Sequence, residues 1–249
     1  MSPRFDRAIL FDMDGVLVDT EPLLLQAVVS MLSQYGADAS RDKPDQWYGR
    51  SEREFYTGMA NAHGIAYREE MEPLVRRTFR RLVCEAPDRA VYPESIPVLS
   101  AFNRVPNLGL AVCSGAGRWK VEINLESLAP ACCTFHAIVS GDDVTRSKPA
   151  PDIFLEGARR LGLPPSRCLV VEDTIAGIRA ATAAGMRSIA VTHTFPEDAF
   201  RALPTPPSPS SLPLRPTQST PRSKRSANPN TNRLILEYAN LSFGRSPSR

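Results

Sequence analysis

Short apolar runs alternate with longer amphipathic segments from about residue 91 onward. The apolar runs have the length of buried strands, and the segments between them place apolar residues three and four positions apart, as on one face of a helix. Strands alternating with helices are typical of a parallel sheet. The pattern predicts helices over 94–104, Arg118–Leu128, Pro151–Leu161 and Ile175–Ala184, and strands over Leu108–Ser114, Phe135–Ser140, Cys168–Glu172 and Ser188–Thr192.

Another strand is predicted near the start of the chain, where an apolar run ends at Phe11, but helices alone follow it. A helix is expected from Thr20 to Gly36, because its first residues are good caps and Gly36 can end it. The spacing of apolar residues predicts two more helices over 42–64 and 68–86. The fold class is therefore α/β, a doubly wound parallel sheet with an inserted block of helices.

This pattern predicts an α/β core formed by 1–19 and 91–203, a helical cap over 20–90, and a tail over 204–249. Nine of the 23 prolines lie in the last 46 residues, mixed with Ser, Thr, Asn and Arg. Such a segment buries too little apolar surface to offset the entropy of ordering it. We interpret the tail as a disordered appendage or the product of an altered reading frame, with one short helix at 234–241.

The charge of the chain is unevenly distributed. The tail carries seven Lys or Arg residues and one Glu, so the formal net charge of +3 leaves the rest of the chain slightly acidic. We therefore expect no nucleic-acid surface there. We expect a cytoplasmic protein without a membrane partner, because no apolar run approaches the length of a bilayer span and the five cysteines form no CxxC pair. The oligomeric state is left open.

Two carboxylates follow the first strand with one residue between them. Asp12 and Asp14 stand at the carboxyl end of an apolar run, where open α/β sheets bind their ligands. Two acids this close repel each other unless a cation or a shared proton relieves the repulsion. The pair predicts a divalent cation and an aspartate nucleophile; the alternative is an ordinary acidic turn.

Polar residues also follow three later strands. Ser114 and Gly115 let backbone amides approach an anion at the start of a helix, Lys148 offers a cation, and Glu172 and Asp173 offer carboxylates. Taken singly, these are compatible with a tight turn, a solvated lysine and a helix cap. Together they supply the parts of a phosphoryl-transfer site, namely carboxylates for Mg²⁺, donors for phosphate oxygens and a lysine for the transferring charge.

Four segments resemble the signature motifs of the haloacid dehalogenase-like (HAD) hydrolase superfamily. They are Phe-Asp-Met-Asp-Gly-Val-Leu-Val-Asp-Thr-Glu-Pro, Ser114 after its strand, Ser-Lys-Pro-Ala-Pro-Asp-Ile-Phe, and Val-Val-Glu-Asp-Thr-Ile-Ala-Gly-Ile-Arg-Ala-Ala. The resemblance extends from about Phe5 to Ala202 in the right order and spacing. It is strongest to the phosphatases and phosphomutases related to β-phosphoglucomutase and phosphoglycolate phosphatase, which carry a small helical cap after the first motif.

The resemblance implies catalytic roles for three residues. Asp12 would attack phosphorus and form an aspartyl-phosphate. Asp14 would protonate the leaving oxygen and then deprotonate the water that releases phosphate. Lys148 would neutralise the nucleophile and the phosphoryl group. The second aspartate, Asp14, also argues against carbon–halogen chemistry, because the dehalogenases of the superfamily lack it.

The resemblance implies binding roles as well. Ser114 and the amide of Gly115 would hold phosphate oxygens. Asp12, Glu172 and Asp173 would bind Mg²⁺, and Asp14 would add its backbone carbonyl. Hard oxygen ligands favour this ion over zinc.

Two departures from the family pattern favour a phosphatase over a mutase. β-Phosphoglucomutases carry a histidine where this chain has Leu24, and an arginine where Glu52 follows Gly49-Arg50-Ser51. Arg50 and Arg53 are candidates for contacting substrate. We expect a Mg²⁺-dependent phosphatase of a small phosphorylated metabolite such as a sugar phosphate. The alternatives are a phosphosugar mutase of the β-phosphoglucomutase type and a catalytically silent regulatory or binding protein.

Overall fold

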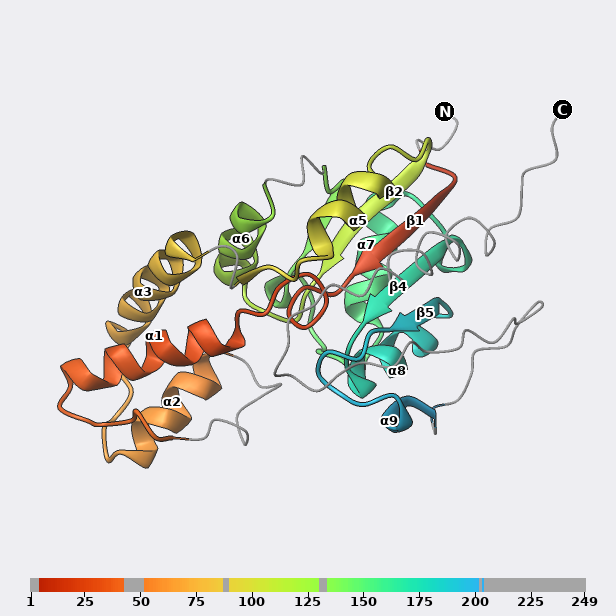
Figure 1. Cartoon of the computed structure of the whole chain (residues 1–249). Coiled ribbons are helices and arrows are strands. Elements are labelled where there is room, and N and C mark those ends of the chain that lie inside the picture. The colour runs from red at the N-terminus through yellow and green to blue at the C-terminus, as the bar shows by residue number, and fades with distance from the viewer. Residues whose placement is uncertain (1–4, 43–51, 87–89, 130–133, 202, 204–249) are drawn as a thin grey trace, which may run out of the picture.

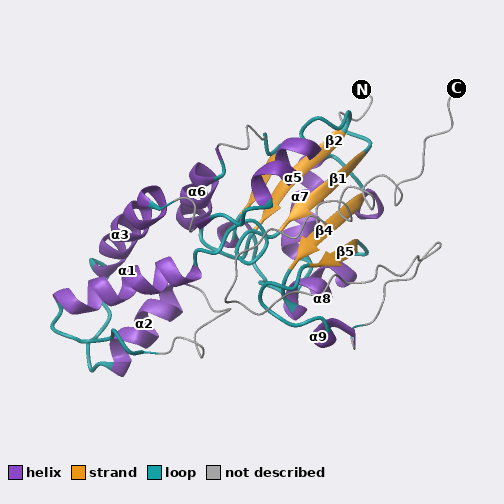
Figure 2. Cartoon of the chain, in the orientation of Figure 1, coloured by secondary structure: helices purple, strands orange, loops and turns teal. Residues whose placement is uncertain are grey.

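A computed structural model describes residues 5–42, 52–86, 90–129, 134–201 and 203 of the chain. Its central strands are β1 (Arg7–Phe11), β2 (Leu108–Cys113), β3 (Ala137–Val139), β4 (Cys168–Glu172) and β5 (Arg187–Ala190). They form one parallel sheet in the order β3-β2-β1-β4-β5 (Figures 1 and 2). The predicted α/β fold with a parallel sheet is confirmed.

Four helices cover the sheet: α5 (Ser95–Phe102), α6 (Arg118–Ser127), α7 (Asp152–Leu161) and α8 (Ile175–Ala183). Residues of α5 and α6 pack on one face, and residues of α7 and α8 pack on the other. Strand side chains alternate between the faces, so in β1 Ile9 and Phe11 join the first cluster while Ala8 and Leu10 join the second. Because both faces are buried, the central strands consist of continuous apolar residues.

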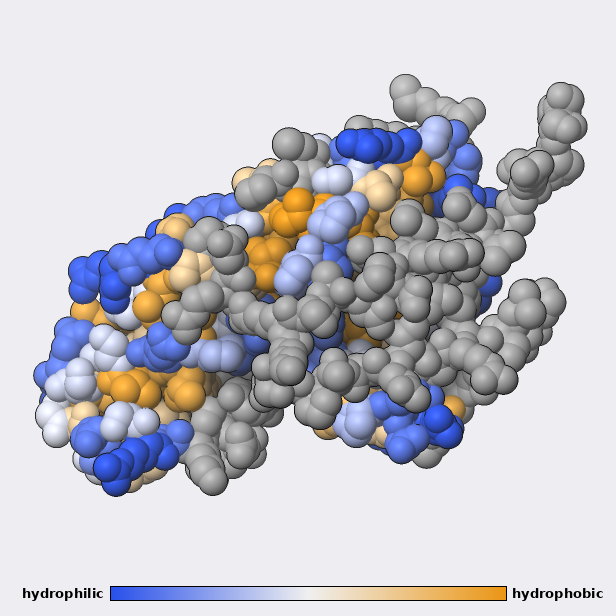
Figure 3. Space-filling view, viewed as in Figure 1, coloured by the Kyte–Doolittle hydropathy of each residue, from blue (hydrophilic) through white to orange (hydrophobic). Residues whose placement is uncertain are grey.

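Three helices lie beside the sheet instead of over its faces: α1 (Glu21–Gln34), α2 (Glu52–Ala62) and α3 (Met71–Glu85) (Figure 1). They share a hydrophobic cluster that includes Met31, Tyr56 and Phe79, and Ile123 of α6 also belongs to it. Hydrophilic residues cover much of their outer surface (Figure 3). The division into a core of 1–19 and 91–203 and a cap of 20–90 stays a prediction.

The boundaries of two predicted helices are wrong. The helix predicted over 42–64 begins only at Glu52 among the described residues, because residue 42 is not helical and 43–51 lie outside them. The helix predicted over 68–86 begins at Met71, which is buried, whereas the three residues before it are exposed and form a turn. Amphipathic spacing identified both helices, and in α3 the regular helix begins at the first buried residue, Met71.

The end of the chain also differs from the predicted pattern. β5 ends at Ala190, before the predicted Thr192, and a short helix α9 (Asp198–Arg201) follows. The predicted tail and its helix at 234–241 lie outside the described residues. Across the described ranges, no helix combines the length and apolar character needed to cross a membrane.

The parallel arrangement positions the candidate site. All five strands run in the same direction, so the segments that leave their carboxyl ends lie along one edge of the sheet. β1 is central and pairs with both β2 and β4. The polar residues that follow these three strands are therefore neighbours, although they are far apart in the sequence.

Candidate active site

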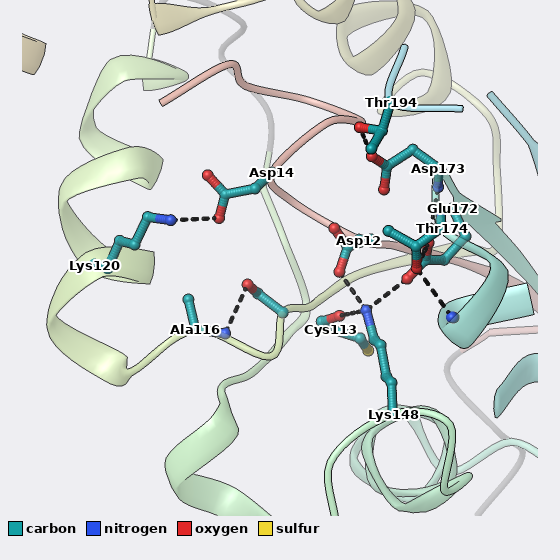
Figure 4. Close-up of polar contacts among 12 residues, drawn as sticks. Asp12, Asp14, Cys113, Ala116, Lys120, Lys148, Glu172, Asp173, Thr174 and Thr194 are labelled. Atoms are coloured by element: carbon teal, nitrogen blue, oxygen red, sulfur yellow. Dashed lines mark hydrogen bonds and ion pairs between the residues drawn. The ribbon is translucent and has the colours of Figure 1, made fainter. Parts of the chain in front are cut away.

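The structure brings residues from four segments together at the carboxyl edge of the sheet (Figure 4). Asp12 follows β1, and its backbone N–H donates to the carbonyl of Val171 in β4. Ser114 follows β2, and Lys148 enters from the loop before α7. Glu172 ends β4. These residues are buried or partly buried, so their charges interact with little screening by water.

Lys148 connects the nucleophile candidate to the carboxylates of the next strand. Its ammonium donates to Asp12 Oδ1 and, over 2.8 Å, to Glu172 Oε1; it also donates to the carbonyl of Cys113 at 3.3 Å. Burial opposes the charged ammonium, but Asp12 and Glu172 outweigh it and raise the pKa of Lys148 above its ordinary value. The lysine is therefore a fixed positive charge between two strand ends.

Asp12, Glu172 and Asp173 form a group that fits a divalent cation. One oxygen from each lies within 4.8 Å of the others. Asp173 Oδ1 is buried and has no hydrogen-bond partner. A buried carboxylate oxygen is costly without a partner, and hard cations such as Mg²⁺ take carboxylate ligands. The residues present therefore fit a divalent ion.

Burial and the charges of neighbouring groups shift the pKa values of these three carboxyl groups. Burial, opposed by Lys148, raises the pKa of Asp12 well above its ordinary value. Burial and then the Glu172 carboxylate raise the pKa of Asp173 to about 7. Burial also acts on Glu172, but Lys148 and donors from Thr174 outweigh it and lower its pKa. A cation in the group would favour the ionised forms of all three acids.

Hydrogen bonds hold Glu172 in place. Its Oε2 accepts from the backbone N–H groups of Asp173 and Thr174 at 2.8 and 2.7 Å and from the Thr174 hydroxyl at 2.9 Å. Thr174 also caps α8 by accepting from the N–H of Gly177. A Cβ on Gly177 would overlap the Glu172 carboxylate. The start of α8 is therefore shaped around this side chain.

The loop after β1 passes close to Asp173. Gly15 has a φ of +80°, which an L side chain rarely adopts, and a Cβ there would overlap the carboxylate of Asp173. Thr194 donates its hydroxyl to Asp173 Oδ2. His193 Nδ1 lies 2.8 Å from the carbonyl of Gly15, and its ring stacks on Tyr92. Neither His193 nor Thr194 was identified as a site residue from the sequence.

Asp14 points toward α6 instead of joining the three-carboxylate group (Figure 4). Its Oδ2 lies 3.1 Å from the ammonium of Lys120, and its Oδ1 accepts from the Thr20 hydroxyl at 2.7 Å. Thr20 is the N-cap residue of α1, as one of the two expected candidates, but its side chain makes no capping hydrogen bond. Sequence reasoning missed Lys120, because a lysine in a polar helix resembles a solvated charge.

The segment after β2 holds the two residues predicted to bind phosphate, Ser114 and Gly115. Ser114 is buried, and its hydroxyl oxygen accepts from the backbone N–H of Ala116 at 3.2 Å. A Cβ on Gly115 would meet no atom within 4 Å, so there is open space beside its backbone. The roles of Ser114 and Gly115 in binding phosphate stay predictions.

Of the two predicted substrate arginines, only Arg53 is among the described residues. Arg50 lies outside the described residues. Arg53 is exposed, forms an ion pair with Glu69 at 3.6 Å and lies over the ring of Tyr67. Its contact with substrate stays a prediction.

A second residue of α2 reaches the sheet region instead. Both carboxylate oxygens of Glu52 accept from the backbone N–H of Gly117, at 3.1 and 3.2 Å. Gly117 immediately precedes α6, so this contact joins the inserted helices to the loop that follows β2. Burial, partly offset by Lys120, raises the pKa of Glu52.

Comparisons with known proteins agree with the geometry. Residues 7–185 match the haloacid dehalogenase-like hydrolase family. The chain is 39% identical over 197 residues to Protein SUPPRESSOR OF QUENCHING 1, chloroplastic, from Arabidopsis thaliana, in an alignment covering 76% of this chain and 18% of that protein. It is 29% identical over 208 residues to Hexitol phosphatase B from Escherichia coli strain K12, covering 76% and 85%.

A solved structure shows the same likeness. CbbY from Rhodobacter sphaeroides, in complex with phosphate, has a TM-score of 0.64 and 28% identity, with coverage of 75% of this chain and 86% of that one. The predicted resemblance to the superfamily is confirmed. The chain belongs to the haloacid dehalogenase-like hydrolase family and is an enzyme of the phosphoric monoester hydrolase class.

Proposed function

We propose that the chain hydrolyses a small phosphorylated metabolite, such as a sugar phosphate or polyol phosphate, with Mg²⁺ and through an aspartyl-phosphate. The observation that carries the proposal is the contact of Asp12 with Lys148 inside a group of carboxylates at the carboxyl edge of the sheet. Among the relatives, Hexitol phosphatase B is named for a phosphorylated polyol, and CbbY was solved with phosphate. The first name agrees with this substrate class, and the phosphate bound to CbbY agrees with phosphoryl-transfer chemistry.

In the first step, Asp12 attacks phosphorus. A P–O bond forms to its carboxylate as the bond to the leaving oxygen breaks. Lys148 contacts the same carboxylate and offsets the negative charge that gathers when an anionic phosphate approaches. Ser114 and the amide of Gly115 hold the phosphate oxygens.

Proton transfer is the role proposed for Asp14. It gives a proton to the leaving oxygen and then accepts one from the water that attacks the aspartyl-phosphate. The second step returns Asp12 to its free form and releases inorganic phosphate. Asp14 is suited to this role because it contacts Thr20 and Lys120 and is not one of the three clustered carboxylates.

Asp12, Asp173 and Glu172, together with the backbone carbonyl of Asp14, are the proposed Mg²⁺ ligands. When bound, the ion supplies positive charge that offsets the charge of the carboxylates and phosphate. The unpartnered Asp173 Oδ1 supports this assignment.

Hydrolysis is favoured over the mutase reaction by the position of Glu52. Its carboxylate, and not an arginine, contacts the loop that follows β2. A negative charge there repels the second phosphate of a bisphosphate intermediate. Phosphate release measured on a sugar phosphate, with no transfer between its positions, is the expected result.

The nucleophile assignment is tested with Asp12→Asn. We expect turnover of a phosphate-ester panel with Mg²⁺ to fall by about 1000-fold or more, since the amide cannot form the acyl-phosphate. Asp6→Asn is the matched control, because Asp6 is exposed and precedes the same strand. Turnover retained by Asp12→Asn would contradict the proposal.

A further inference from the structure

Lys120 is a buried cation that the steps above leave without a role. It lies on α6, and only 2% of its side chain is exposed. Its ammonium is 3.1 Å from Asp14 Oδ2 and 2.5 Å from Glu21 Oε1. Burying a lysine without carboxylates is costly, so a position this enclosed requires the ion pairs that surround it.

The surrounding acids come from separate elements. Asp14 lies in the loop after β1, Glu21 begins α1, and Glu52 lies on α2. Burial opposes the charged form of Lys120, but these three carboxylates outweigh it and raise its pKa above the ordinary value. Lys120 therefore stays positively charged and attracts Asp14 from one fixed direction.

The same face of α6 holds Asp14 in a second way. Asn124, one helical turn after Lys120, donates to the Thr20 hydroxyl at 3.1 Å, and that hydroxyl donates to Asp14 Oδ1 at 2.7 Å. Both oxygens of Asp14 are thus held from α6, one directly and one through Thr20. Asp12 and Asp14 thus pair with different lysines, Asp12 with the partly buried Lys148 and Asp14 with the buried Lys120 (Figure 4).

We propose that Lys120 is a positioning residue that holds Asp14 for proton transfer to the leaving oxygen. The inference rests on the proposed function, in which Asp14 is the proton donor. In the step it supports, the bond from Asp12 to phosphorus forms, the bond from phosphorus to the leaving oxygen breaks, and the proton of Asp14 moves to that oxygen. Without Lys120, the carboxylates of Glu21 and Glu52 repel the Asp14 carboxyl group, and only the Thr20 hydroxyl still holds it.

The test compares two leaving groups. An alkoxide is a strong base and needs a proton as it departs, whereas p-nitrophenolate is a weak base and leaves without one. Loss of an acid catalyst therefore slows cleavage of an alkyl phosphate far more than that of p-nitrophenyl phosphate. A purely structural defect slows both to the same extent.

Lys120→Met, Asp14→Asn and the double variant are compared in single turnovers with glycerol 3-phosphate and p-nitrophenyl phosphate. We expect Lys120→Met to slow phosphoenzyme formation from the alkyl ester by about tenfold or more and from the aryl ester by less than about threefold. In the double variant the two losses are not additive, since both act on one proton transfer. Glu21→Gln is the control, because it removes a partner of Lys120 but leaves the pair with Asp14.

The outcomes separate the two proposals. If Asp14→Asn shows no leaving-group dependence, the proton-transfer role of Asp14 is wrong. Suppose instead that Asp14→Asn shows the leaving-group dependence. If Lys120→Met then slows cleavage of both esters equally, or of neither, the positioning role of Lys120 is wrong. If Lys120→Met does not fold, the double variant Lys120→Met/Glu21→Gln is used instead, because it removes one charge of each sign. Its rates with the alkyl and aryl esters are compared in the same way.

Discussion

Asp173 is a carboxyl group whose ionisation is opposed by the folded protein. Its pKa is raised to about 7, first by burial and then by Glu172. The unfolded chain ionises this group at about pH 4, so between about pH 4 and 7 the folded state binds more protons and loses stability as pH rises. We expect the free energy of unfolding of metal-free protein to fall over this range and Asp173→Asn to remove part of that fall, as measured by urea denaturation in EDTA.

Magnesium provides the control for this prediction. Above about pH 7 the ionised Asp173 is available to a cation, so Mg²⁺ stabilises the wild-type chain and stabilises Asp173→Asn less. A fall of the same size in Asp173→Asn and the wild-type chain would contradict the assignment of the pH effect to this residue.

Residues that directly follow apolar strands were predictable as site candidates. Asp12, Glu172 and Asp173 end or follow continuous apolar runs, and the parallel topology then brings them together. Lys120 and Thr194 were not predictable as site residues, because nothing in their local sequence distinguishes them from solvated residues. Their contacts depend on how segments over 20 residues apart are brought together by the fold.

At the scale of elements, the start of α8 is fitted to the side chain that ends β4. Gly177 leaves the space that the Glu172 carboxylate occupies, so Gly177→Ala forces that carboxylate to move. We expect a loss of about 3 kcal/mol in the free energy of unfolding, from overpacking, together with a fall in turnover. Urea denaturation and a phosphate-release assay measure the two effects.

Gly162→Ala is the matched comparison for this prediction. Gly162 ends α7 with a φ of +69°, and a Cβ there would meet nothing within 4 Å. The strained backbone alone costs about 1 kcal/mol, and turnover is unchanged. If Gly177→Ala kept full turnover, Glu172 would not need its present position.

Element types were predictable, whereas several boundaries were not. The alternation of strands and helices after residue 91 predicts the sheet because each buried strand is a continuous apolar run. The start of α3 at Met71 was missed, since apolar spacing alone does not mark where a helix becomes regular. Thr20 resembled a helix cap, but its hydroxyl donates to Asp14 instead.

At the scale of the whole molecule, contacts between the inserted helices and the sheet region were beyond sequence reasoning. Glu52 contacts Gly117, Arg80 forms an ion pair with Glu126, and Phe79 packs edge-on against Trp119. Each contact joins residues at least 40 positions apart. Periodicity describes one element at a time, so it predicts neither these partners nor the placement of Glu52 beside the loop that follows β2.

The final prediction concerns the part of the chain needed for folding and activity. The segment 204–249 is rich in proline and poor in large apolar residues, and the family match ends at residue 185. A segment of this composition contributes little burial, so a chain ending at Leu203 is expected to keep its Tm within about 3 °C and its kcat/KM within about threefold. Thermal unfolding and a phosphate-release assay with the same substrate measure both.

A chain ending at Gly185 is the contrasting variant. It lacks β5, which pairs with β4 from Leu169 to Glu172, and it lacks the Thr194 hydroxyl that donates to Asp173. Losing an edge strand exposes the backbone and side chains of β4 beside the three-carboxylate group, so this variant is expected to lose both cooperative unfolding and turnover. If the chain ending at Leu203 failed in the same way, the tail would be required for the fold, and the composition argument would be wrong.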